Sequence, residues 1–121
     1  MTNNFKLEEF NCKSGAPMPL SVRVNIERVA NNLQALRDEL GKPITITSGY
    51  RSPAHNKAVG GAQNSQHVLG TAADFKVAGL SPKHVATVIE VLIAEGKMEE
   101  GGLKAYRSWI HYDCRGARAR W

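Results

Sequence analysis

The chain has 121 residues, little cysteine and no long apolar run. Its two cysteines, Cys12 and Cys114, stand far apart and neither belongs to a Cys-x-x-Cys pair, which excludes a cysteine zinc site. One distant pair is weak evidence for a disulfide, so we expect free, partly buried thiols. No apolar stretch approaches the roughly 18 residues that a membrane span needs, so no membrane span is expected.

The N-terminal residues 1–12 also lack the apolar stretch of a signal peptide. We therefore expect synthesis in the cytoplasm without a signal peptide, although the protein need not act there. A composition of 42% hydrophobic and 22% charged residues excludes a disordered chain. The length suits a single domain, 1–121, which we expect to be a monomer.

Charge of one sign is in excess, since the chain carries a net charge of +5. Part of the excess lies near the end of the chain, at Arg115, Arg118 and Arg120. Such a charge suits an acidic partner, either nucleic acid or a polyanionic cell wall, but it is also common in proteins with neither partner. No glycine-and-aromatic signature of nucleic-acid binding accompanies it, so we expect no nucleic acid partner.

Two segments have the pattern of helices. Apolar residues recur at steps of three and four from Val22 to Leu40, and Gly41 with the proline that follows predicts the end of this helix. Ser81 and the next proline predict the start of a second helix, which ends at Gly96.

The strand patterns are short. Residues 44–47 and 72–77 read as strands, residues 56–67 as a loop, and residues 101–116 as two strands joined by a tight turn. Helices and strands do not alternate as in a doubly wound fold. We therefore expect an α+β fold, an antiparallel sheet with flanking helices.

Two predicted strand regions each present a histidine and a carboxylate: His67 with Asp74, and His111 with Asp113. On a strand, His111 and Asp113 share one face with Trp109. Two imidazoles and one carboxylate suit catalytic zinc and leave a fourth position for water. Manganese or cobalt can occupy such a set, and ordinary buried hydrogen-bonded pairs would give the same spacing.

Three segments together resemble the zinc D-alanyl-D-alanine peptidases: SGYRSPAHNKAVGG (48–61), SQHVLGTAADF (65–75) and WIHYD (109–113). That family includes D-alanyl-D-alanine carboxypeptidases, dipeptidases of vancomycin resistance and phage endolysins, and it shares the fold of the hedgehog signalling domain. Its motif, Ser-x-His followed by Gly-x-Ala-x-Asp, is matched in order by Ser65, His67, Gly70, Ala72 and Asp74. The resemblance covers nearly the whole chain and is greatest to the short C-terminal-type domains of phages and prophages.

The resemblance implies that His67, Asp74 and His111 bind Zn²⁺. It also implies that Arg51 contacts substrate or stabilises the developing oxyanion, a role in which a fixed guanidinium is effective. A structural loop arginine is the alternative. Ser65 is a candidate to bind substrate or to hold the ligand loop.

The aromatic residues Trp109, Tyr106 and Tyr50 are candidates to line the cleft and contact sugar or peptide. Aromatic residues near a β-sheet site are more often part of the core. Asn56 is expected to fix the backbone of the arginine loop.

One position departs from the pattern of the family. Many relatives carry the general base three residues before the last zinc histidine, where this chain has Ser108. The nearest carboxylate is Asp113, as the base or as a group that orients the site. Asp113 as a ligand, with His111 as the acid or base, is a further possibility; Glu99 and Glu100 are more distant candidates for the base.

The implied function is a zinc metallopeptidase acting on the peptide stems of bacterial peptidoglycan, as a D,D-carboxypeptidase or endopeptidase of phage or prophage type at the cell wall. Two alternatives remain. One is a non-catalytic, zinc-stabilised binding or structural module, which Ser108 favours. The other is a nucleic-acid-binding domain driven by the basic residues, whose affinity would fall steeply with salt.

Overall fold

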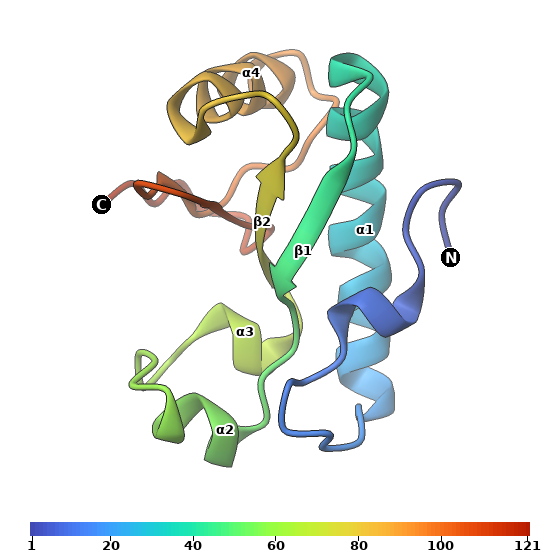
Figure 1. Ribbon diagram of the computed structural model, residues 1–121. Coiled ribbons are helices and arrows are strands. Elements are labelled where there is room, and N and C mark those ends of the chain that lie inside the picture. The colour runs from blue at the N-terminus through green and yellow to red at the C-terminus, as the bar shows by residue number, and fades with distance from the viewer.

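The computed structural model describes residues 1–121 and contains one antiparallel sheet (Figure 1). Its four strands are β1 (Ile44–Ser48), β2 (Ala72–Val77), β3 (Leu103–Ala105) and β4 (Ile110–Asp113), in the order β1-β2-β4-β3. Every neighbouring pair is antiparallel. The expected α+β class and all four strand positions are confirmed.

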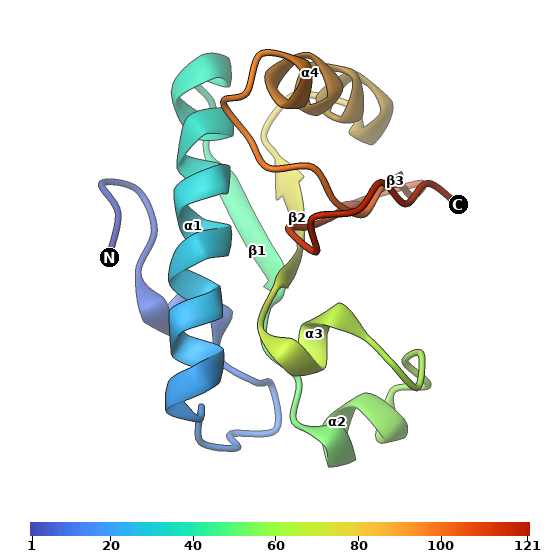
Figure 2. The same cartoon turned by 180° about the vertical axis from the view of Figure 1, so that it is seen from behind.

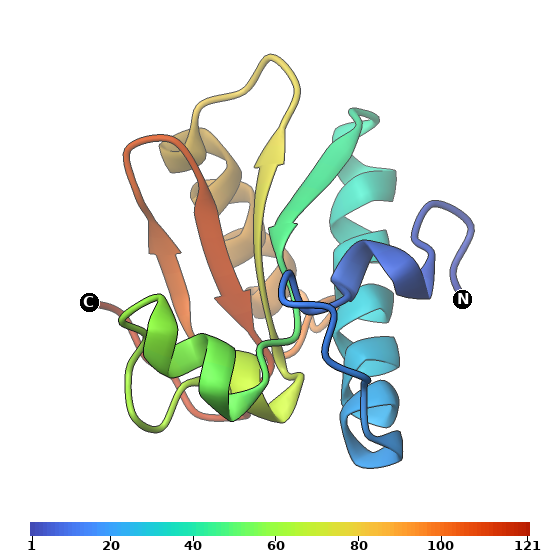
Figure 3. The same ribbon diagram turned by 60° about the horizontal axis from the view of Figure 1, so that its bottom comes forward.

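Two long helices lie on one face of the sheet. Helix α1 (Leu20–Leu40) and helix α4 (Pro82–Ala94) lie behind the strands in Figure 3, and Figure 2 shows α1 in front of β1 when the molecule is viewed from behind. Gly41 ends α1 in the left-handed conformation, at φ 62°, which glycine adopts without strain. The Ser81 hydroxyl accepts a hydrogen bond from the His84 backbone and caps α4, so both predicted helices are confirmed.

Three short helical segments complete the fold: the 3₁₀ helix η1 (Leu7–Phe10), α2 (Pro53–Ala58) and α3 (Gln66–Leu69). Helices α2 and α3 lie at the other face of the sheet (Figure 3). The expectation of a loop over 56–67 was therefore wrong in part. These helices are too short to show an apolar period, and each begins at a serine cap that the glycines and polar residues around it obscured.

The hydrophobic core fills the space between the sheet and the two long helices. Ala73 and Phe75 of β2 point into this core and are fully buried, and so are Ile110 and Tyr112 of β4. Strand side chains alternate, so Ala72, Asp74 and Lys76 project to the opposite face, where α2 and α3 lie. The alternation predicted for both strands is confirmed, and it gives the sheet one apolar face and one polar face.

Both cysteines are free, as expected, and both are buried rather than only partly buried. None of the helices combines the length and the apolar character needed to cross a bilayer.

Candidate functional site

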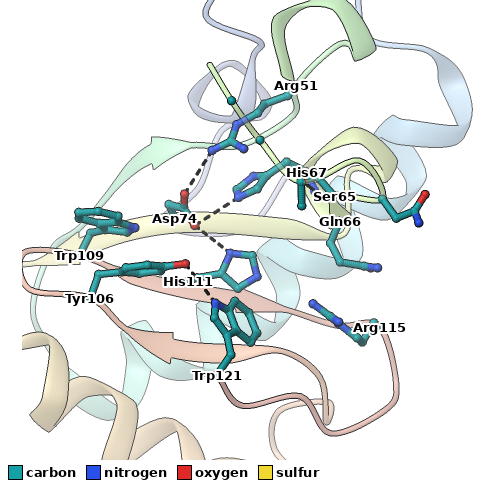
Figure 4. Close-up of a pocket in the computed structure, with 14 residues that line it drawn as sticks. Arg51, Ser65, Gln66, His67, Asp74, Tyr106, Trp109, His111, Arg115 and Trp121 are labelled. Atoms are coloured by element: carbon teal, nitrogen blue, oxygen red, sulfur yellow. Dashed lines mark hydrogen bonds and ion pairs between the residues drawn. The ribbon is translucent and has the colours of Figure 1, made fainter. Parts of the chain in front are cut away.

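Three polar side chains from separate elements meet on the polar face of the sheet (Figure 4). His67 comes from α3, Asp74 from β2 and His111 from β4. Their potential ligand atoms all lie within 4.8 Å of one another. Asp74 and His111 are direct partners in the β2–β4 register, which brings together residues far apart in sequence. His67 lies on a helix rather than in the loop that we expected over residues 56–67.

His67 is oriented by the backbone. Its Nδ1 donates to the Gly49 carbonyl at 2.8 Å, and its Nε2 faces Asp74 Oδ1 at 3.2 Å. The Ser65 hydroxyl accepts a hydrogen bond from the His67 backbone amide and caps α3. Gly70 ends this single turn at φ 80°, and Val22 leaves no room for a side chain there. The short helix therefore fixes the position of the imidazole.

His111 is oriented by a carboxylate instead. Its Nε2 donates to Asp113 Oδ2 at 2.8 Å, and its Nδ1 faces Asp74 Oδ1 at 2.9 Å. Burial disfavours the charged ring, but the hydrogen bonds with Asp113 and Asp74 outweigh burial and raise the pKa of His111. Burial raises the pKa of Asp74, but hydrogen bonds from His111 and His67 outweigh burial and hold this pKa well below its usual range.

Asp113 lies behind His111 and its side chain is completely buried. Arg115 donates to both of its oxygens, at 2.8 and 2.7 Å, and the Gly102 amide donates to Oδ1 at 2.8 Å. Burial opposes ionisation of Asp113, but hydrogen bonds from Arg115 and His111 outweigh it and hold the pKa of Asp113 well below its usual range. Asp113 does not line the cleft. Of the two main roles considered for it, the geometry favours orienting His111 over direct proton transfer.

Two glycines make this buried carboxylate possible. Gly101 and Gly102 run against Asp113 so closely that a Cβ at Gly101 would collide with the Asp113 carbonyl. A Cβ at Gly102 would collide with the Asp113 carboxylate and with Arg115. The absence of side chains lets the backbone amide reach the carboxylate.

The three candidate ligands open into a cleft of about 480 Å³. Part of its wall consists of Arg51, residues 60–62 and residues 64–66, and another part consists of aromatic residues and an arginine, namely Tyr106, Trp109, Arg115 and Trp121. Asp74 is the only carboxylate among the lining residues. The cleft is thus polar on the side of α2 and α3 and largely aromatic on the side of β3 and β4.

Arg51 is held in the cleft by three side chains. Its Nε donates to the Ser48 hydroxyl at 3.2 Å and its Nη1 to Asn56 Oδ1 at 3.3 Å. Its Nη2 lies 3.6 Å from Asp74 Oδ2. Asn56, in turn, donates to the Ala62 carbonyl, which is the backbone-fixing contact expected of it. The guanidinium is therefore fixed beside the three candidate ligands.

The aromatic residues divide between cleft and core. Trp109 stacks on Tyr106 with ring centres 4.5 Å apart, and both line the cleft. Tyr50 is only 5% exposed and belongs to the core, so it does not line the cleft. The sequence reasoning missed Trp121, whose ring lies edge-on to His111 at 5.2 Å. An aromatic residue ten positions beyond His111 follows no strand period, and no sequence signal identified it.

The other carboxylate candidates lie elsewhere. Glu99 pairs with Arg28 at 2.6 Å, and Glu100 pairs with Arg118 and Arg120. Neither lines the cleft, and Ser108 is exposed outside it. The structure therefore does not bring Glu99 or Glu100 into the site.

Comparison with known proteins adds two findings. The model of the peptidase M15 family matches residues 3–113 of this chain. The zinc D-Ala-D-Ala carboxypeptidase of Streptomyces albus G is 43% identical over 78 residues, which is 60% of this chain and 31% of the relative. The match thus spans about a third of the curated relative's length.

Proposed function

Because the chain belongs to the peptidase M15 family, we propose that it is a zinc-dependent peptidase that hydrolyses the peptide stems of bacterial peptidoglycan. The observation that carries the proposal is the meeting of His67, Asp74 and His111 at the floor of an open cleft. The similar carboxypeptidase is named for zinc and D-Ala-D-Ala, and it supports both the metal and a substrate of that kind.

The donor set fits zinc. His67 directs its Nδ1–H to a backbone carbonyl, and His111 directs its Nε2–H to Asp113, so each ring keeps one nitrogen for a metal. With one Asp74 oxygen these nitrogens make the three-ligand set of catalytic zinc sites. A bound zinc ion supplies a Lewis acid that lowers the pKa of water to about 7 and polarises a carbonyl group.

Residues of the chain supply the remaining functions. The fixed Arg51 guanidinium would stabilise negative charge developing on the carbonyl oxygen and bind substrate. Asp113 acts through His111, holding the ring and its tautomer. Trp109 offers an apolar face to the substrate, and Ser65 lines the cleft while its hydroxyl caps α3.

The finer assignment is a D,D-carboxypeptidase or endopeptidase of the phage or prophage type, which lyses or remodels the cell wall as a monomeric single domain. The resemblance of the motifs to phage endolysins supports this assignment. The net charge of +5 suits a polyanionic wall.

One observation favours a second candidate, a non-catalytic zinc-stabilised module that binds the wall. Apart from Asp74, the cleft is lined by no carboxylate that could take a proton from water. Such a module would bind zinc and peptidoglycan fragments without cleaving them.

Digestion of purified peptidoglycan, followed by mass spectrometry of the soluble fragments, separates the two candidates. The peptidase should release fragments that vanish with a chelator, return with zinc and are absent for His67→Ala. The fragment masses identify the bond. Zinc-loaded protein that leaves several wall chemotypes intact, yet sediments with them, would establish the binding module instead.

A further inference from the structure

The segment Arg115–Trp121 returns from the end of β4 and places an aromatic ring in the cleft (Figure 4). The Trp121 ring lies edge-on to His111, and its Nε1 donates to the Tyr106 hydroxyl at 3.2 Å. The Arg115 guanidinium lies 5.7 Å from the centre of the Trp121 ring. The ring is therefore held between the candidate metal ligand His111, Tyr106 after β3 and Arg115 after β4.

The backbone before Trp121 is fixed by Arg120. This side chain donates to both oxygens of Glu90, at 2.9 and 2.8 Å, and to Glu100 at 3.1 Å. It also donates to the Gly101 carbonyl at 2.6 Å. Ala119 bonds to the backbone of residues 101 and 103, which continues the sheet locally. Only 22% of the Arg120 side chain is exposed, although its partners Glu90 and Glu100 are 38% and 31% exposed.

Arg118 contacts the same two glutamates and is a natural comparison. Its contacts are 3.4 to 3.5 Å long and its side chain is 61% exposed. Exposed ion pairs of this kind contribute little to stability. Arg120 is thus the residue that fixes the path of the chain into the cleft.

The Trp121 ring is held in place without being buried. Trp121 remains 52% exposed, although a ring of this size is usually buried or partnered. Trp109 stacks face to face on Tyr106, whereas no aromatic ring stacks on Trp121, which meets His111 in a T-shaped contact and has the Arg115 guanidinium over its ring. An aromatic surface fixed beside a metal site and open to a cleft suits contact with methyl and methylene groups of a ligand.

We propose that Trp121 is a substrate-binding residue that contacts the aliphatic side chain of the stem residue next to the scissile bond, and that Arg120 positions it. The inference rests on the proposed peptidase function for the identity of the ligand. The polar wall around Arg51 then contacts the peptide backbone, and the Trp121 wall selects the side chain.

The kinetic test compares four variants of the zinc-loaded protein on a pentapeptide ending in D-Ala-D-Ala. Trp121→Ala should raise KM about tenfold with kcat little changed, since about 1.4 kcal/mol of contact energy corresponds to a factor of ten. Trp121→Phe should restore most of the affinity. Arg120→Ala should raise KM like Trp121→Ala, while the control Arg118→Ala should not. Unchanged KM in both Trp121→Ala and Arg120→Ala overturns the proposal.

A binding measurement keeps this test separate from hydrolysis. The chain has two tryptophans, so Trp109→Phe leaves Trp121 as the sole tryptophan. Its fluorescence should change saturably when the same pentapeptide is added to the zinc-loaded variant. A saturable change, with no product formed by the zinc-loaded wild-type protein, would support the role of Trp121 while contradicting the peptidase. Hydrolysis with no fluorescence change and an unaltered KM in Trp121→Ala would support the peptidase and contradict the role of Trp121.

Discussion

The two histidines of the site are oriented in different ways. His67 donates to the carbonyl of Gly49, and the helices α2 and α3 between β1 and β2 each begin at a serine cap. His111 donates to the buried carboxylate of Asp113, which is part of a charged network with Arg115. No side-chain substitution removes a backbone carbonyl, whereas one substitution removes Asp113. The β4 side of the site is therefore the side on which a change away from the cleft can alter metal binding.

The largest effect is expected where the two sides do not differ, at the ligands themselves. His67→Ala and His111→Ala should each lose bound zinc and all peptidase activity, because catalytic zinc needs three protein ligands and each variant keeps only two. Zinc content after dialysis, measured by mass spectrometry, tests this. His84→Ala is the matched control, since His84 is exposed on α4. Stoichiometric zinc in His67→Ala would contradict the ligand assignment.

The next effect should appear only on the β4 side, where Asp113 orients His111. Asp113→Asn should weaken zinc binding about 10- to 100-fold, as loss of a carboxylate behind a ligating histidine does. Asp113→Ala should also lower the free energy of unfolding by about 3–5 kcal/mol, because Arg115 and His111 lose a buried partner. Competition with a zinc-binding dye and chemical unfolding measure the two effects.

Glu99→Gln is the control for Asp113, because it removes a carboxylate from an exposed pair with Arg28 and should cost less than about 1 kcal/mol. If Asp113 were instead the general base, Asp113→Asn would lose kcat while zinc affinity stayed intact.

A third effect belongs to the side of His67, where Arg51 lies. Arg51→Ala should lower kcat about 10²- to 10³-fold with zinc content unchanged, since the guanidinium stabilises charge present in the transition state. Arg51→Lys keeps the charge but cannot contact Ser48, Asn56 and Asp74 together, so it should recover little of the loss. Steady-state kinetics decide this. A rise in KM alone would reduce Arg51 to substrate binding.

The smallest effect compares the two buried thiols. Cys114, on the β4 side, has its pKa raised to about 11 by burial, so it stays protonated at pH 8. For Cys12, which contacts Ser52 at the start of α2, burial raises the pKa, but hydrogen bonds from Ser14 and Ser52 outweigh burial and lower it. Iodoacetamide at pH 8 should therefore label Cys12 first, and mass mapping of the labelled peptides would show it. Equal rates would remove this contrast between the two sides.

The sequence predicted the elements that have a clear period. Helix α1 and strand β2 each bury one regular face, so their positions could be predicted from spacing alone. The three candidate ligands were also predicted, with help from the family resemblance. Helices α2 and α3 were missed because a single capped turn carries no periodic signal.

The position of Asp113 could not be predicted either, although its strand face was. Side-chain alternation places Asp113 on the polar face, but it does not predict that Gly101, Gly102 and Arg115 lie against a fully buried carboxylate there. Trp121 enters the cleft through contacts of Arg120 with residues of α4 and of the segment before β3. Such long-range contacts have no local sequence signal.

The close approach of Gly101 and Gly102 to Asp113 has a consequence for mutational tolerance. Neither glycine lines the cleft, yet any side chain at either position would collide with atoms of Asp113. A scan of all single substitutions should show both glycines to be as intolerant as the three candidate ligands. A map of the active site drawn from such a scan alone would therefore extend behind His111, to two residues that no substrate reaches.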